Sequence, residues 1–373
     1  MTESLFFLYK FLFTNIIFAF ILCSCLRRLN KDQEHSTVEL FLVSLGLAPA
    51  LVTLLLYFAF LCCPPLPSVG YFLIITVVYV SLFWLGRKEF PAIYGDFKYW
   101  LIRKWHKLKK HENNGSPAPG IWTRRAKEIT RWFYVSLVLL VLIYLALSFR
   151  SVLHMPVDGY DTLSYAAEGK ALFKIKHIEF RSMLLDPETG IYLPSLHAPS
   201  FSLILTWEKI LNSLFGLKSD LFFRSIAFYF GLLILAGQYY CLRIKGKWLA
   251  LLGTIGLLSC FSFFCALIYI HIDTYRIFFI AVVWFYLAGA LKKRDRLSYL
   301  LLGITSGMAA FAHTLGALMA AITILVFFVF LKGSLLYKLK IASLVFFLTL
   351  ATGGIHYVID TLWGSGWIFN FHL

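Results

Sequence analysis

Long apolar runs recur along the chain, and they constrain the fold more than any other feature. The run over 38–61 contains a single charged residue, Glu39. A helix needs roughly 20 apolar residues to cross the hydrocarbon core of a bilayer. Such runs are too long and too uniformly apolar for the alternating strands of a membrane β-barrel. Because 60% of the 373 residues are hydrophobic and only 14% are charged, the sequence predicts an all-α polytopic membrane protein.

We expect about ten transmembrane helices. The predicted ranges are 5–26, 38–61, 69–86, 132–150, 221–242, 248–269, 274–291, 297–312, 314–331 and 341–359. The first range is followed by Arg27 and Arg28 and has no small-residue cleavage site. This pattern favours a retained first helix over a cleaved signal peptide.

The net charge of +16 indicates membrane topology and not nucleic-acid binding, because the basic residues collect in alternate connectors. The connector 87–131 has twelve Lys or Arg against four Asp or Glu, so the positive-inside rule assigns it to the cytoplasm. The other basic connectors then fall on the same side. The segment 151–220, with six basic and eight acidic residues, faces outward.

The chain divides into three predicted parts. Residues 1–86 form three accessory transmembrane helices, and 87–131 form the basic connector with an interfacial helix. Residues 132–373 form a transmembrane module with an outer loop over 151–220. We expect that loop to carry two juxtamembrane helices, and the second, over 199–215, to lie amphipathically at the outer interface.

Three aspartates are candidate functional groups on the outer side. Asp158 and Asp161 follow the fourth span, where Asp161 could equally be a helix N-cap and Asp158 a turn residue before glycine. Asp273 opens a later apolar run. A carboxylate at such a boundary is often functional, although an N-cap or an ion pair with Arg276 would also explain it.

Two histidines and an arginine complete the candidates. His197 stands before Pro199 at the start of a predicted helix, and it is either a site residue or a surface histidine. Arg224 could pair with a phosphate, whether of bulk lipid or of a bound substrate. His313 lies between two apolar runs, where an ionisable group is costly to bury and therefore suggests a function.

The order of these residues resembles the GT-C glycosyltransferases, in particular the protein O-mannosyltransferases and the lipid A aminoarabinose transferases. The resemblance covers about 130–373. The resemblance rests on the order of the motifs and on the side of the membrane where each is expected, since no single motif is specific. The matching features are Asp161 followed by Tyr165 and Ala166, the His-x-Pro of His197 and Pro199, Arg224, Asp273 and the glycine-rich stretch 303–313.

The resemblance implies transfer of a sugar from a polyprenyl-phosphate donor to an acceptor on the non-cytoplasmic face. Asp161 would be the general base, with Asp273 beside it to orient the acceptor. Arg224, His313 and His197 would offset the phosphate charge, and Asp158 would help to bind substrate. The resemblance also implies Mg²⁺ or Mn²⁺ held by Asp161 and Asp273, although some family members need no metal.

Two departures from the family pattern affect these expectations. His313 occupies the place of a lysine that meets the donor phosphate in bacterial members. The chain also stops after about seven family-like spans, so we expect either a truncated protein or a partner subunit that supplies the C-terminal part. The other expected partners are the donor and membrane lipid, with no nucleic acid, and the bacterial plasma membrane is favoured over the endoplasmic reticulum.

Two other classes of function remain open. A transporter or flippase for a lipid-linked sugar would use the same outer carboxylates, with Asp273 and His313 as a proton relay. A non-catalytic membrane subunit would need neither the outer carboxylates nor a proton relay. Convergence of Asp161 and Asp273 on one outward cavity would favour a transferase, whereas polar groups reaching the inner side would favour a transporter.

Overall fold

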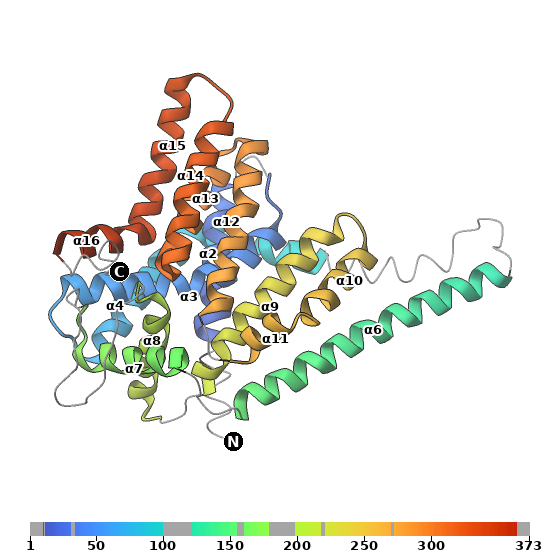
Figure 1. Ribbon diagram of the computed structural model, residues 1–373, viewed down its shortest axis with the longest axis horizontal. Helices are drawn as coiled ribbons and strands as arrows, with labels where there is room; N and C mark the ends of the chain where they lie inside the picture. Colours follow the sequence, from blue (N-terminus) through green and yellow to red (C-terminus); the bar gives the residue numbers. More distant parts are fainter. Residues whose placement is uncertain are drawn as a thin grey trace, which may run out of the picture.

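The computed structural model describes residues 10, 12–30, 34–99, 121–154, 160–178, 198–217, 221–269 and 272–363. Within these ranges the regular structure is helical, without strands (Figure 1), and the all-α prediction is confirmed. In chain order the elements are the π-helix η1 (Leu12–Ile17), α2 (Phe18–Leu29), α3 (Thr37–Cys62), α4 (Ser68–Gly86), the 3₁₀-helix η2 (Arg87–Glu89), α6 (Ile121–His154), α7 (Tyr160–Ile175), α8 (Ser200–Phe215), α9 (Leu221–Arg243), α10 (Lys247–Leu258), α11 (Phe261–Ile268), α12 (Asp273–Lys293), α13 (Arg296–Ala312), α14 (Thr314–Phe330), α15 (Leu335–Thr349), the π-helix η3 (Leu350–Gly354) and α16 (Ile355–Trp363).

The protein is an integral membrane protein by the length and apolar character of its helices. Six helices in the described ranges are long and apolar enough to span a bilayer, or seven if α10 and α11, bent by 73° at their junction, form one span. The expected number of about ten is not confirmed. Helices α13 and α14 have 17 residues each, which is short for the hydrocarbon core.

Helix α3 forms the centre of the bundle. Ser36 caps its first turn by accepting a hydrogen bond from the Glu39 backbone N–H at 3.1 Å, as expected for a Ser-x-x-Glu start. Large aromatic side chains along α3 and its neighbours, such as Tyr57, Phe60 and Tyr79, are at most 1% exposed. One continuous apolar core runs from α2 through α8, α9 and α12 to α15, so the predicted accessory helices pack directly against the rest.

The basic helix ends gather at one end of the bundle. Ser36, before α3, shares a hydrogen bond of 2.8 Å with Tyr240 near the end of α9. Lys293, in the last turn of α12, donates to the Glu34 carbonyl at 2.5 Å. The last turns of α2, α9 and α12 all carry basic residues. We call this the basic end, and it agrees with the expected collection of basic clusters on one side.

The glycine-rich helix α13 packs unusually closely on α15 and η3. A Cβ on Gly307 would lie 1.9 Å from the Thr352 hydroxyl, and one on Gly353 would lie 2.0 Å from the Gly307 carbonyl oxygen. Small residues are needed where two membrane helices approach to this degree. The glycine-rich stretch therefore has a packing role that is independent of any family resemblance.

Helix α6 leans away from the bundle in Figure 1. Its residues 128–154 are apolar enough to cross a membrane, yet only 11% of the span is buried. The hydroxyl groups of Tyr134 on α6 and Tyr239 on α9 share a hydrogen bond of 3.0 Å. The Lys247 ammonium lies over the Tyr134 ring. An apolar helix with so little protein contact is suited to a lipid surrounding.

The two helices expected between 151 and 220 are present as α7 and α8, which lie side by side (Figure 1). The amphipathic exposure expected of 199–215 is wrong, because protein encloses the helix on all sides over most of its length. Twelve of the thirteen residues from 200 to 212 are buried, including Glu208. Helix α8 packs on α3 and α4, and Lys10 pairs with the buried Glu208 carboxylate. The expected interfacial helix of the connector falls largely outside the described residues.

Candidate active site

Aromatic rings connect the second turn of α7 to the first turns of α8 and α12, at the end opposite the basic one. The Tyr165 ring on α7 lies 5.4 Å from Phe201 at the start of α8. Phe201 in turn lies 6.1 Å from Tyr275 in the first turn of α12. This chain of rings brings α7, which carries Asp161 one turn before Tyr165, to the helix that begins with Asp273.

Asp273 belongs to a charged cluster on the first turn of α12. Its Oδ1 accepts a hydrogen bond from the Arg276 guanidinium. Another Arg276 nitrogen, Nη1, lies 3.4 Å from Nε2 of His313, in the break between α13 and α14. The ion pair with Arg276 that the sequence allows is therefore present, and it also reaches His313.

The orientation of the His313 ring follows from its capping role. Its Nδ1 accepts a hydrogen bond from the Leu315 backbone N–H at 3.0 Å and caps α14. In the neutral ring the proton must then be on Nε2, the nitrogen that faces Arg276. Two donors, Nε2–H and the guanidinium, thus lie close together beside the N-terminus of a 17-residue helix. This arrangement is suited to an anion.

Arg224 is held at the junction of α9 and α6. Its Nη1 donates to the Leu153 carbonyl at 3.3 Å, in the last turn of α6. A cation is favourable at a helix C-terminus, where the last carbonyl groups have no intrahelical partner. This contact gives Arg224 a structural role that the sequence does not suggest.

Three predicted site residues are described only in part or not at all. Asp161 is the second residue of α7, inside its first turn and not at the N-cap position considered for it, and its side chain lies outside the described part. Asp158 and His197 also lie outside. The structure therefore joins Asp273 to His313 and leaves the predicted roles of these three residues as predictions.

No family model, curated protein or solved structure matches the chain. The site is therefore interpreted from its own chemistry and from the order of its residues.

Glu168 is a candidate that the sequence does not single out. It lies seven residues after Asp161 on α7, on the same helix face as Asp161 and Tyr165. The Ser202 hydroxyl on α8 donates to its Oε2 at 2.5 Å. Desolvation by burial raises the pKa of Glu168 to about 7, although the Ser202 hydrogen bond opposes the shift. A carboxyl group with such a pKa can exchange a proton near neutral pH.

A second missed feature is a buried ion pair beneath α8. Lys10 donates to Glu208 Oε1 at 2.8 Å, and their side chains are 3% and 0% exposed. The same Glu208 oxygen accepts from Asn212 at 2.9 Å. Burial raises the pKa of Glu208, and Lys10 opposes that shift. Their separation of 198 positions hides this pair from any local pattern.

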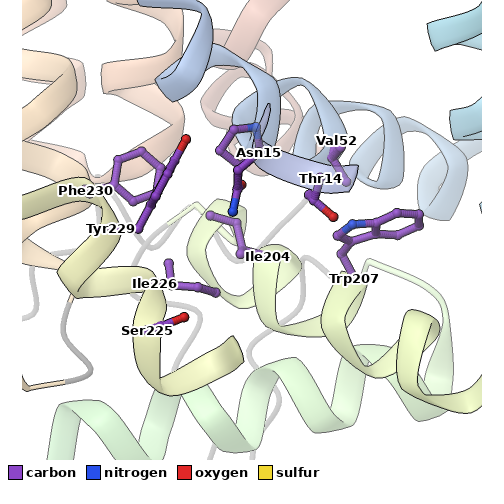
Figure 2. A pocket seen from close by; sticks show the side chains of 10 residues that line it. Thr14, Asn15, Val52, Ile204, Trp207, Ser225, Ile226, Tyr229 and Phe230 are labelled. Atoms are coloured by element: carbon purple, nitrogen blue, oxygen red, sulfur yellow. The ribbon is translucent and has the colours of Figure 1, made fainter. Parts of the chain in front are cut away.

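A small cavity of about 10 Å³ lies beside this pair, between η1, α8 and α9. Figure 2 shows Thr14 of the π-helical turn and Trp207 of α8 facing it. Within the described residues, neither the Thr14 hydroxyl nor the Trp207 indole N–H has a hydrogen-bond partner. The volume is close to that of one water molecule, too small for a substrate.

The described donors do not by themselves form a divalent cation site. No group of three His, Cys, Asp or Glu side chains suitable for a metal occurs among the described residues. Asp273 is already paired with the positive charge of Arg276, which opposes a second cation nearby. The expected Mg²⁺ or Mn²⁺ would therefore depend on Asp161 and on residues outside the described ranges.

Proposed function

We propose that the protein is a membrane glycosyltransferase that moves a sugar from a polyprenyl-phosphate donor to an acceptor hydroxyl. The observation that carries the proposal is the cluster of Asp273, Arg276 and His313 at the end of the bundle where α7 and α8 begin. It includes two donors suited to a phosphate, and the rings of Tyr165, Phe201 and Tyr275 link this end of α12 to the helix that bears Asp161.

The chemistry requires little more than a base and positive charge. Asp161 takes the proton of the acceptor hydroxyl as its oxygen attacks the anomeric carbon of the sugar. The bond between that carbon and the phosphate oxygen breaks, and the phosphate leaves with the electron pair. Arg276 and His313 offset the negative charge that develops on the phosphate. Asp273 holds the Arg276 guanidinium in position.

Copurified lipid gives the most direct test of substrate class. Mass spectrometry of the purified protein should detect a polyprenyl phosphate. In a transfer assay with a radiolabelled polyprenyl-phosphate sugar, Asp161→Asn should lower the rate by about 10²- to 10⁴-fold, the usual contribution of a general base. Asp96→Asn makes the same change at the basic end, where Asp96 pairs with Arg27, and should leave the rate unchanged. Wild-type transfer by Asp161→Asn would contradict the proposed mechanism.

The divalent cation is tested separately by chelation. Because the Arg276 guanidinium already provides a positive charge and the neutral His313 ring provides an N–H donor, we expect transfer to persist in EDTA. A loss of transfer that Mg²⁺ or Mn²⁺ restores would instead support metal binding by Asp161 and Asp273.

A transporter for a lipid-linked sugar is the second candidate. The bend of 73° between α10 and α11 favours it, because discontinuous membrane helices are common in secondary transporters. The buried pair of Lys10 and Glu208 is also typical of a polar path inside a bundle. A vesicle assay distinguishes the two, since a transporter moves the intact donor across the bilayer whereas a transferase cleaves it.

A further inference from the structure

A cavity of about 390 Å³ lies between α3, α9, α10 and α12, towards the basic end. It includes Glu39 in the first turn of α3 and Gln238 and Tyr240 in the last part of α9. The proposed transfer site is at the first turn of α12, whereas the α12 residues that line the cavity begin at Phe278. The cavity is therefore separate from that site, and its volume is in the range of small-ligand pockets.

The walls of the cavity are apolar and open towards the membrane. Leu233 and Ile234 of α9 face Val282 and Phe285 of α12. Phe285 is 38% exposed although it lies near the middle of a span, where the surrounding solvent is lipid. A ligand would enter from the bilayer and would need an apolar chain.

Polar atoms without partners mark the other end of the ligand. Tyr286 is 1% exposed, and its hydroxyl lacks a hydrogen-bond partner among the described residues. The side-chain oxygen of Gln238, Oε1, likewise lacks a partner among the described residues. The side-chain nitrogen of Gln238 donates to the Gly253 carbonyl at 3.1 Å. Both residues line the cavity. Buried polar atoms are costly when unpaired, so the ligand head must offer hydrogen bonds.

The charges of the lining select the type of head group. The Gln238 carbonyl and the Glu39 carboxylate only accept hydrogen bonds, whereas the Tyr286 hydroxyl can donate or accept. A phosphate or carboxylate head would face these acceptors without a donor for most of its oxygens. The Glu39 carboxylate already has a hydrogen-bond partner in His35, whose Nδ1 lies 2.5 Å from its Oε1. A neutral hydroxyl meets the donor requirement without adding a buried charge.

We propose that this cavity binds a long-chain lipid alcohol, with its hydroxyl group at Tyr286 and Gln238 and its chain between α9 and α12. This site would hold a membrane lipid in addition to the donor of the proposed transferase. The proposal of a lipid site stands whether or not the protein is a transferase.

One glycine provides a selective test. Gly237 lines the cavity, and a Cβ placed on it would have no atom within 4 Å. Gly237→Leu should therefore fill the cavity without a backbone clash. Gly256 on α10 has the same open surroundings and is not among the lining residues, so Gly256→Leu is the matched control.

The experiment uses hexadecanol that carries a photoreactive diazirine on its chain, with the purified full chain in detergent. We expect labelling of peptides within 233–240 and 278–286. Gly237→Leu should reduce this labelling about fivefold or more, whereas Gly256→Leu should match the wild type. Equal labelling of the two variants, or even labelling along the chain, would overturn the site. If Gly237→Leu fails to fold, Ala281→Leu fills the same cavity from α12.

Head-group probes test the chemical class. Hexadecanoate, hexadecylamine and hexadecyl methyl ether carry the same chain and the same diazirine. Hexadecanol should label more strongly than each of them, and Tyr286→Phe should reduce its advantage over the ether by about two- to tenfold, the equivalent of one hydrogen bond. Stronger labelling by the amine or the carboxylate, or an unchanged advantage in Tyr286→Phe, would overturn the assignment to an alcohol.

Discussion

Charged clusters occupy both ends of the bundle, but they differ in how completely they are enclosed. At the basic end the His35 side chain is 1% exposed and lies between two carboxylates, Glu39 at 2.5 Å and Asp295 at 3.4 Å. At the opposite end Asp273 and Arg276 remain 30% and 23% exposed. The enclosed cluster ties the start of α3 to that of α13, whereas the open one has groups that a substrate could reach.

Enclosure predicts which charges stabilise the fold and which serve chemistry. A charge that is removed from water must be paired, and loss of its partner is strongly destabilising. A partly exposed pair contributes little to stability because water and salt screen it. The following variants test this contrast in order of decreasing effect on stability.

The largest effect is expected at the buried pair of α8. Lys10→Met would leave the Glu208 carboxylate, which is 0% exposed, without its cation, and should lower stability by about 3–5 kcal/mol. Thermal unfolding in detergent measures this change. The double variant Lys10→Met with Glu208→Leu should regain most of the loss because no buried charge remains. Lys209→Met, a half-buried neighbour on the same helix, is the control. A destabilised double variant would show that the pair is not the cause.

A smaller effect is expected at the basic end. His35→Ala would remove the group between Glu39 and Asp295 and should lower stability by about 2–3 kcal/mol, the cost of leaving buried polar groups unpaired. Sugar transfer per folded molecule should not change, since His35 lies at the other end. Lys340→Ala, at an exposed position in the first half of α15, should melt like the wild type. A loss of transfer in folded His35→Ala would break the proposed division between the two ends.

At the other end, the raised pKa of Glu168 predicts that stability depends on pH. Its pKa is about 7 in the fold against 4.5 for the free group, so the folded protein retains the proton more strongly. Stability from this group is therefore greatest below about pH 4.5 and falls as the pH rises to about 7. The full shift corresponds to about 3 kcal/mol, which partial exposure reduces to about 1–2 kcal/mol.

Glu168→Gln should remove this pH dependence, because an amide cannot ionise but can still accept from Ser202. We expect it to melt like the wild type at pH 4.5 and at a higher temperature at pH 8. Glu128→Gln on the exposed face of α6 should leave the pH profile unchanged. An identical pH profile of melting for Glu168→Gln and the wild type would contradict the raised pKa.

The sequence predicts features that depend on local or compositional patterns. The helical class, the long spans such as α3 and the ion pair of Asp273 with Arg276, three positions apart, are all of this kind. The burial of Glu208 is different because it depends on Lys10, 198 positions away, and on packing between α8 and α3. A short helix with two charges has the composition of an interfacial helix until the neighbours that cover it are known.

Asp273→Asn tests the open cluster, where the smallest loss of stability is expected. The pair with Arg276 is partly exposed, so the free energy of unfolding should change by less than about 1 kcal/mol. Transfer should nevertheless fall by about 10²-fold, because Arg276 would no longer be held beside His313 and a displacement of about 1 Å is sufficient for such a loss. Asp273→Glu, which keeps the carboxylate, should recover part of the rate. If Asp273→Asn instead lowers stability strongly while the rate of transfer per folded molecule is unchanged, the cluster is structural and the contrast between the two ends is lost.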